Sequence, residues 1–276
     1  MNLVRFIAVT QSPALLTGHH YPLGCAHQPS IPRLLSPEIR GLEARSLAIY
    51  LRVARAHRIP FRLDETNSVS CGGVPGISNT FASSLWATAY ITQAMAAGVV
   101  GVNLQGNPDN CPGYTPLCAP DAAAAAAGAL TARPDWYALQ LTRALIGARP
   151  LLTRISAAPT PNLVAGAFSA PGHVLKLILV DDETPGSAPL SLKVRVGPGL
   201  ARGQVLRLTG PSQQATGGVL LGGRSVAADG SLGAPANPER ARLRGQSLTV
   251  RVPASSAALV TLEPPGRGIG PARGHP

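Results

Sequence analysis

The sequence has 276 residues, of which 45% are hydrophobic, and its formal net charge is +11. This length is enough for two domains or one large barrel, and the hydrophobic content, with 30 glycines and 27 prolines, indicates a globular, loop-rich protein rather than a disordered chain. The charge does not indicate a nucleic-acid partner, because the arginines are scattered along the sequence, Lys176 and Lys193 are the only lysines, and aromatic residues make up only 4%.

The amino-terminal residues show no export or membrane signal. No apolar run approaches the ~18 residues that a membrane-spanning helix needs. Residues 1–16 also lack the ordered basic, apolar and small-residue regions of a signal peptide. The chain is therefore predicted to be soluble, with no membrane span.

The first half of the chain alternates strand-like and helix-like segments, which is typical of a parallel α/β fold. A short strand in LLTGHHY is followed by a helix in SPEIRGLEARSLAIYLRVARAH. Ser36 is its predicted N-cap, and Pro37 occupies its first position. The spacing of Leu42, Ile49 and Val53 predicts that these residues form the buried face.

FRLDE is the next predicted strand, and SNTFASSLWATAYITQAMAAG is the next helix. In this helix Phe81, Leu85, Ala89 and Thr92 are spaced for burial, and Gly98 is the expected C-terminal stop. The continuous apolar run VVGVNL then predicts a strand covered on both faces. Helical segments return in the alanine run and in DWYALQLTRALIG.

Beyond about residue 150 the periodicity becomes alternating. In SLKVRV, Leu192, Val194 and Val196 face one way and the charged residues between them face the other. SLTVRV repeats the pattern, and similar short runs occur at NLVAGAF, HVLKLILV, GQVLRL, GGVLL and AALVTL. This predicts an antiparallel β-sandwich. The acidic cluster at residues 181–183 precedes a Pro-Gly pair and is predicted to be a solvated turn.

These patterns divide the chain into an α/β part at residues 1–148, a sandwich at residues 149–264 and a flexible tail at residues 265–276. No motif indicates a metal site or a cofactor, because the cysteines lack the paired short spacings of a zinc site.

The four cysteines lie in loop-like segments of the first half. One interpretation pairs Cys111 with Cys118 and Cys25 with Cys71, and the other leaves all four as free thiols. If the disulfides form, the protein belongs to an oxidising compartment and is secreted or periplasmic.

Glu65 ends the strand FRLDE, within PFRLDETNSVSCGGVPG. In a (β/α)8 barrel the chemistry takes place at the carboxyl ends of the strands. Strict alternation sends Glu65 to one side of the strand with Phe61 and Leu63, and Asp64 to the other, so the two carboxylates are not expected to share a pocket. A helix cap or a salt bridge to an arginine is the alternative role of Glu65.

Polar residues recur at three successive strand ends, and this recurrence predicts a site for a polar ligand. The first strand ends in His19, His20 and Tyr21; the second is followed by Asn67, Ser68, Gly72 and Gly73; the third ends near Asn103 and Gln105.

The segments GHHYPLGC, FRLDETNSVSCGGVPGISNTFASSLWATAY, GVVGVNLQGN and VLLGGRSVAADGSL resemble the C-terminal half of glycoside hydrolase family 79, the β-glucuronidase and heparanase-like enzymes. The resemblance implies the last part of a (β/α)8 barrel, strands six to eight, followed by a β-sandwich. It also implies that Glu65 is the nucleophile of a retaining glycosidase whose substrate is a β-glycoside.

The second carboxyl group that retaining hydrolysis requires has no counterpart in this sequence. In the family the acid/base glutamate ends the fourth barrel strand, before the part that this chain resembles. Asp109 is the alternative acid within the chain. Three strands alone would also leave open a sheet edge and an apolar inner face.

Three interpretations follow. The chain is a fragment of a retaining glycosidase, which the missing N-terminal barrel segment would complete. Alternatively, it is a non-catalytic carbohydrate-binding or structural module. The third interpretation is an active enzyme with an unconventional acid.

Overall fold

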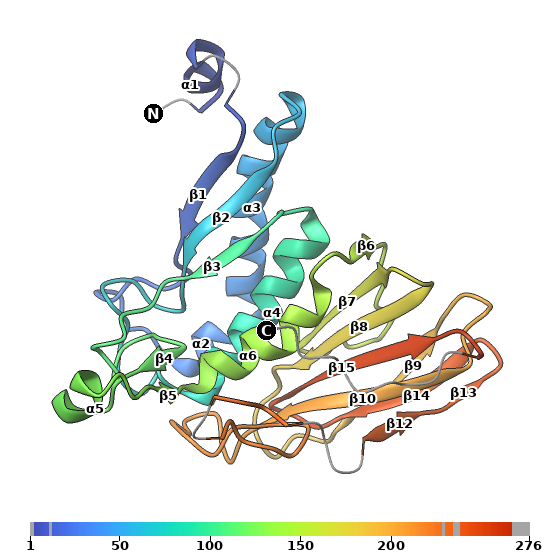
Figure 1. The fold of residues 1–276 in the computed structure, drawn as a ribbon. Helices are drawn as coiled ribbons and strands as arrows, with labels where there is room; N and C mark the ends of the chain where they lie inside the picture. Colours follow the sequence, from blue (N-terminus) through green and yellow to red (C-terminus); the bar gives the residue numbers. More distant parts are fainter. Residues whose placement is uncertain (1–2, 11–12, 228–229, 234–237, 267–276) are drawn as a thin grey trace.

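The computed structural model describes residues 3–10, 13–227, 230–233 and 238–266. Most of the predicted tail, from residue 267 on, lies outside these residues. The first half of the chain contains a three-stranded parallel sheet in the order β1 (Leu16–His20), β2 (Phe61–Thr66) and β3 (Val102–Leu104) (Figure 1).

Among the helices of the first half, α3 (Pro37–Ala56) packs directly against this sheet. In chain order these helices are α1 (Leu3–Val9), α2 (Ile31–Leu34), α3, α4 (Phe81–Ala97), α5 (Ala122–Ala126) and α6 (Pro134–Thr142), the last continued by a 3-10 turn at Arg143–Leu145. A small hairpin of β4 (Leu117–Cys118) and β5 (Thr131–Ala132) flanks α5. Among the described residues, no helix has the length and apolar character to cross a membrane.

The second half forms two antiparallel sheets. The larger has the order β11 (Leu220–Leu221), β10 (Arg202–Thr209), β15 (Ser256–Glu263), β8 (Val174–Asp181), β7 (Leu163–Ala170) and β6 (Arg149–Leu151), with β12 (Glu239–Ala241) also paired to β10. The smaller has the order β13 (Leu243–Arg244), β14 (Ser247–Val252) and β9 (Leu190–Arg195).

The two antiparallel sheets face each other across an apolar core. Leu248, Val250 and Val252 of β14 contribute one side of this core, and residues such as Leu177 and Val260 of the larger sheet contribute the other. The opposite face of the larger sheet packs on α4 and α6. The molecule is therefore layered as parallel sheet, helices, large antiparallel sheet and small antiparallel sheet (Figure 1).

The start of α3 confirms the predicted cap. The Ser36 hydroxyl accepts a hydrogen bond from the Ile39 N–H at 3.2 Å, and Pro37 occupies the first turn. The end of α4 is confirmed too, because Gly98 has a φ of 94°, the left-handed conformation that closes many helices.

The predicted buried face of α3 is wrong in two positions, since Leu42 and Ile49 are 42% and 54% exposed. Glu43 lies on the buried face instead, where its Oε1 accepts a hydrogen bond from the Trp86 indole N–H at 2.7 Å. This hydrogen bond offsets part of the free-energy cost of burying the Glu43 carboxyl group, which a hydrophobic pattern would place in solvent. The other buried residues of the face are Ile39, Leu47, Leu51, Val53 and Ala54.

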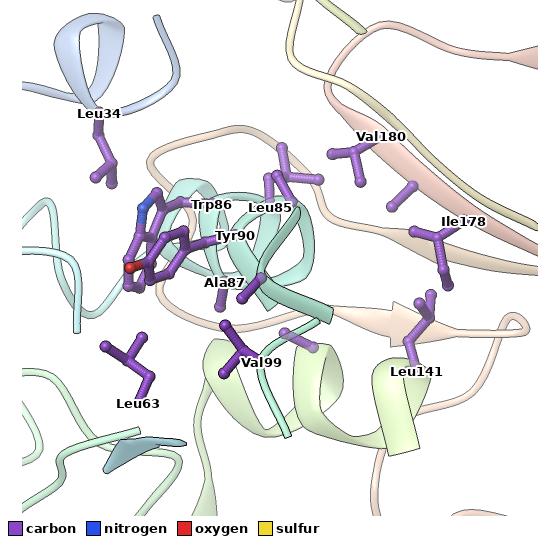
Figure 2. Packing of buried hydrophobic residues seen from close by; sticks show 14 of the residues in the cluster. Leu34, Leu63, Leu85, Trp86, Ala87, Tyr90, Val99, Leu141, Ile178 and Val180 are labelled. Carbon is purple, nitrogen blue, oxygen red and sulfur yellow. The ribbon is translucent and has the colours of Figure 1, made fainter. Parts of the chain in front are cut away.

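Helix α4 is the centre of the main core and is buried over most of its surface. Figure 2 shows Trp86 and Tyr90 pointing toward Leu34 and Leu63, while Leu85 lies on the side of Val180. One helix thus joins the parallel sheet to the large antiparallel sheet, and the two halves of the chain share a continuous core.

Strand β3 is not covered on both faces as predicted. It has three residues, Asn103 is exposed, and the preceding Val100 is 60% exposed. In the described residues β3 pairs only with β2, so it is an edge strand. A strand at a sheet edge loses the cover that neighbouring strands and their crossover helices provide.

The prediction of an apolar open face on the parallel sheet is also wrong. Phe61 and Leu63 are fully buried on the helical side. Because side chains alternate along a strand, the open face carries polar residues instead, among them Thr17, Arg62 and Asp64.

The acidic cluster at residues 181–183 is not a solvated turn. Asp181 and Asp182 are 0% and 4% exposed. The Arg40 Nη1 of α3 contacts Asp182 Oδ2 at 2.9 Å, and its Nη2 donates to the Asn162 amide oxygen. The cluster lies where α3 meets β8, so packing between the two halves removes these carboxylates from water.

Candidate active site

Glu65 lies near the carboxyl end of β2, the middle strand of the parallel sheet. The pairing register shifts between Gly18 and His19 and again between Leu63 and Thr66. These irregularities break the alternation that the sequence predicted. Glu65 therefore does not follow Leu63 into the helical core, and its side chain remains about one-third exposed.

Tyr21 is the principal hydrogen-bond donor to Glu65. Its hydroxyl lies 2.8 Å from Glu65 Oε1, and the Tyr114 hydroxyl lies 3.2 Å from the Tyr21 hydroxyl. The two tyrosine rings stack with their centroids 5.9 Å apart. Burial raises the pKa of Tyr21 above its ordinary value, and the bonds to Tyr114 and Glu65 raise it further. The hydroxyl therefore stays protonated and donates to the carboxylate.

His19 lies on the other side of Glu65. Its Nδ1 is 3.5 Å from Glu65 Oε2, and its Nε2 is 3.6 Å from Asp64 Oδ1. The two carboxylates thus flank one imidazole ring, although alternation predicted that they would point to opposite sides. The register shift at His19 places it beside Glu65 in the adjacent strand.

His20 does not join this group, in contrast to the prediction. Its Nδ1 lies 3.2 Å from the Ser46 hydroxyl of α3, and its ring is 5.7 Å from the Tyr90 ring of α4. Burial lowers its pKa. His20 follows His19 directly, so it points to the opposite face of the sheet and contacts the helices.

Asn67 and Ser68 are fully buried and support the backbone. The Asn67 amide donates to the Gln105 carbonyl at 2.7 Å, and Asn67 Oδ1 accepts the Ser68 N–H at 2.7 Å. Burial raises the pKa of the adjacent Asp135 carboxyl to about 7, although the Ser83 and Asn67 side chains oppose this shift. Neither Asn67 nor Ser68 presents a free polar group to a ligand.

Gly72 and Gly73 bring two loops together. The Gly72 carbonyl accepts the Tyr114 N–H at 3.3 Å. Gly73 has a φ of 90°, and a Cβ on it would lie 2.6 Å from the Tyr114 nitrogen. These glycines therefore allow the close approach that places the Tyr114 ring beside Tyr21.

Two disulfides hold the same loops. Cys25, after β1, is bonded to Cys71, after β2, and Cys111 is bonded to Cys118 in the segment that carries Tyr114. Both bonds are compatible with an extracellular or periplasmic location.

Asn103 and Gln105 are exposed near the end of β3. The Asn103 side-chain oxygen accepts a hydrogen bond from Arg62 Nη2 at 2.5 Å, so the described contact of Asn103 is with Arg62 and not with Glu65. Gln105 pairs through its backbone with Thr66. Asp109 is exposed, and in the described part of the chain its carboxyl has no contact with Glu65.

Sequence reasoning missed Tyr114. Its position in CPGYTPLC, between two cysteines, was the available signal, because a short disulfide loop can hold an aromatic ring in place. Within the described ranges, no three His, Cys, Asp or Glu side chains are grouped as a metal site.

A scan against protein-family models and a search of curated proteins found no match to this sequence. Several solved structures, in contrast, are similar to the structure of this chain. A 4-O-α-L-rhamnosyl-β-D-glucuronidase from Fusarium oxysporum 12S has a TM-score of 0.70 and 23% identity, over 89% of this chain and 52% of its own. A GH51 α-L-arabinofuranosidase from Thermotoga petrophila RKU-1 has a TM-score of 0.65 and 16% identity, over 91% of this chain and 53% of its own.

A GH30 endoxylanase from Clostridium papyrosolvens C71 has a TM-score of 0.52 and 12% identity, over 90% of this chain and 48% of its own. The chain thus spans about half the length of these structures. All three are glycoside hydrolases by description, and at these identities the likeness concerns the fold alone. The chain has the fold of part of a glycoside hydrolase.

Proposed function

We propose that this chain is the nucleophile-bearing part of a retaining β-glycoside hydrolase of the family 79 type. Residues 1–148 would form the last part of its (β/α)8 barrel, and residues 149–264 its C-terminal β-sandwich. The glycoside hydrolase fold over half the length of the similar structures supports this proposal. The glucuronidase description of the Fusarium oxysporum structure agrees with a β-glucuronide as substrate.

The observation that carries the proposal is the contact of Tyr21 with Glu65. A carboxylate near the end of a parallel strand, with a hydroxyl donor at 2.8 Å, is fixed in direction but still reachable from solvent. The structural alternatives for Glu65 are a helix cap or a salt bridge to an arginine. In the described residues no arginine is paired with Glu65, and the N-cap position of α4, the helix that follows β2, is Thr80 and not Glu65.

The chemistry assigns a different role to each group. Glu65 attacks the anomeric carbon and forms a glycosyl ester, while the bond to the leaving oxygen breaks. Tyr21 keeps Oε1 oriented through its hydrogen bond, so Oε2, on the side of His19, is available for the attack. Water then hydrolyses the ester and releases the sugar with retained configuration.

Protonation of the leaving oxygen requires a second carboxyl group about 5 to 5.5 Å from the nucleophile. Asp64 lies on the other side of the His19 ring from Glu65, where its Oδ1 contacts the ring Nε2, and it is not the proposed acid. A complementing segment of barrel strands is the proposed source of this acid, and it would pair with the open edges of β1 and β3. The chain alone would then react only with glycosides whose leaving group departs without protonation.

The test is intact-mass spectrometry after incubation with 2,4-dinitrophenyl 2-deoxy-2-fluoro glycosides, as the glucuronide and the glucoside. We expect one sugar to add to the wild-type chain and peptide mapping to locate it on Glu65. Glu65→Gln should remain unlabelled, whereas Asp64→Asn, the matched change one residue away, should still be labelled. A folded wild-type chain that takes up neither sugar, or an adduct that survives in Glu65→Gln, would contradict the proposed nucleophile.

A further inference from the structure

The outer face of the small antiparallel sheet carries a group of exposed cations. The inner side chains of β14, such as Leu248 and Val250, are buried against the larger sheet. The outer side chains alternate with them and are exposed. We call this outer surface the basic face, and its cations are Lys193, Arg195, Arg244 and Arg251.

The strand register places a hydroxyl residue beside each cation of the two longer strands. Lys193 lies opposite Thr249, and Arg195 lies opposite Ser247. Arg251 lies opposite Ser191 in the same pairing. Residues directly opposite in an antiparallel pair share one face of the sheet, so cations and hydroxyls alternate across the surface. Neighbouring cations along a strand are about 7 Å apart, from the rise of two residues.

These cations have no acidic partner on the sheet. The ion pairs of the described residues do not include any of the four. Glu239, on nearby β12, is bound to Arg207 by two hydrogen bonds of 2.5 and 2.6 Å. The positive charge of the basic face is therefore not neutralised within the described part of the chain.

A groove at the edge of the large sheet contains further cations. It lies between β10 and the segment that joins β12 to β13, and Arg202, Arg240 and Arg242 line it together with Gln204. Leu243 also lines the groove, and the next residue in the chain belongs to the basic face. Because Val205 and Ala241 face the core between the two sheets, the alternate residues Arg202, Gln204 and Arg240 lie on the opposite face of the large sheet, so the groove is not part of the basic face. The four cations of the basic face spread over three strands, which favours a long ligand over a small ion.

We propose that the basic face binds an acidic polysaccharide, a glycan chain that bears carboxylate or sulfate groups. Guanidinium groups bind such anions through paired hydrogen bonds, and three of the four cations of the basic face are arginines. The serine and threonine hydroxyls between them can bond to sugar hydroxyls. The strands of the small sheet contain no aromatic residue on which a nucleic-acid base could stack.

The basic face lies at the opposite end of the layered molecule from Glu65, with the helices and the large antiparallel sheet between them (Figure 1). It would hold a polymer without touching the bond that reacts. The inference does not depend on the role of Glu65 and would hold for a chain that only binds carbohydrate.

The same charges also prevent the edge strand β9 from pairing with another sheet. A binding experiment must separate this role, and simple net charge, from recognition. The face variant carries Lys193→Gln, Arg195→Gln, Arg244→Gln and Arg251→Gln. The control variant removes the same charge from exposed arginines elsewhere: Arg45→Gln, Arg52→Gln, Arg58→Gln and Arg154→Gln.

Binding is measured by biolayer interferometry to immobilised polygalacturonate and dextran sulfate at about 0.15 M NaCl, with neutral dextran as a blank. The first polymer presents carboxylates and the second presents sulfates. We expect the wild-type chain to bind at least one of them. The face variant should bind about tenfold more weakly or worse, because several exposed ion contacts are lost together, and the control variant should stay within about twofold of wild type.

Three results would overturn the inference: a wild-type chain that binds neither polymer, an equal loss in both variants, or tighter face-dependent binding to duplex DNA or to phosphatidylserine vesicles. Thermal unfolding and size-exclusion profiles establish that each variant is folded and monodisperse. If the fourfold face variant fails this control, the pair Lys193→Gln and Arg251→Gln, in the longer strands, replaces it with an expected loss of about threefold.

Discussion

The Tyr21 hydroxyl donates a hydrogen bond of 2.8 Å to Glu65 Oε1, across 44 residues of sequence. Tyr21 directly follows β1, and Glu65 lies near the end of the neighbouring parallel strand β2, so both side chains are at the same end of the sheet. The tyrosine pKa is raised by burial, so the donor does not lose its proton in the neutral range. The carboxylate is therefore held in one orientation before any ligand arrives.

Tyr21→Phe removes this donor and keeps the ring. A hydrogen bond to a charged group contributes about 1.5 to 3 kcal/mol, so we expect labelling of Glu65 by the fluoro glycosides to slow by roughly 10- to 100-fold. Tyr114→Phe removes only the longer contact between two hydroxyls and should slow labelling by less than about tenfold. The rate is followed by mass spectrometry. Equal rates in wild type and Tyr21→Phe would show that Tyr21 does not position the Glu65 carboxylate.

Gly73→Ala should disturb the loop that carries Tyr114. The added Cβ would lie 2.6 Å from the Tyr114 backbone nitrogen, and the φ of 90° is unfavourable for alanine. Gly76 is the matched control, because its φ is 79° but no atom lies within 4 Å of a Cβ there. Both variants carry the backbone strain of about 1 to 2 kcal/mol. We expect urea unfolding to show a clearly larger loss for Gly73→Ala, and equal losses would rule out the close approach.

Because Glu43 is buried, we predict that its contribution to the free energy of unfolding falls as the pH rises. Burial raises its pKa from 4.5 to about 8, although the bond from Trp86 opposes the shift. The folded chain thus keeps a proton that the unfolded chain releases between these values. The stabilising contribution is complete below pH 4.5 and is lost progressively as the pH rises toward 8, at up to about 1.4 kcal/mol per pH unit.

Glu43→Gln removes this titration and keeps an acceptor for Trp86. We expect the variant to unfold at a higher temperature than wild type at pH 8, with little difference at pH 5. Asp135 and Asp182, whose pKa values burial raises to about 7, leave some pH dependence in both proteins. The measurement is thermal unfolding of both proteins at pH 5 and pH 8. If the difference in unfolding temperature between wild type and Glu43→Gln is the same at both pH values, Glu43 is not the source of the pH dependence.

The pair of Arg40 and Asp182 joins α3 to the large antiparallel sheet, with side chains only 14% and 1% exposed. Arg40→Met would leave Asp182 buried without its cation and should cost about 3 to 5 kcal/mol. Asp182→Asn leaves Arg40 bound to Asn162 and to the Leu35 carbonyl, so its cost should be smaller. Urea unfolding of both single variants and the double variant tests this. Additive losses would mean that the two side chains are not coupled.

Local signals predicted much of the secondary structure. Ser36 and Pro37 mark the start of α3, and Gly98 marks the end of α4, because caps depend on a few adjacent residues. The alternation of SLKVRV and SLTVRV predicted two strands that the structure pairs as β9 and β14. Period-two patterns are reliable where one face of a strand is buried and the other is solvated.

The candidate site was predictable only in part. The position of Glu65 near a strand end could be read from FRLDE, but its orientation could not, because a register shift in β1 and β2 breaks the alternation. For the same reason His19, rather than His20, lies beside it. Tyr114 comes from a loop more than forty residues away, and only a close approach at Gly73 brings it to Tyr21.

By itself, the sequence determined several of the helix and strand ends, such as the start of α3 and the end of α4, since capping, turns and periodicity act over a few residues. Only the tertiary structure decided which charged side chains are buried and which lie together on one surface. Asp182 follows a strand like any turn residue, yet the packing of α3 removes it from water. The arginines are scattered along the sequence, but the register of β9, β13 and β14 brings three of them, Arg195, Arg244 and Arg251, onto one surface with Lys193. Such contacts between distant segments depend on how the layers pack, which no local pattern encodes.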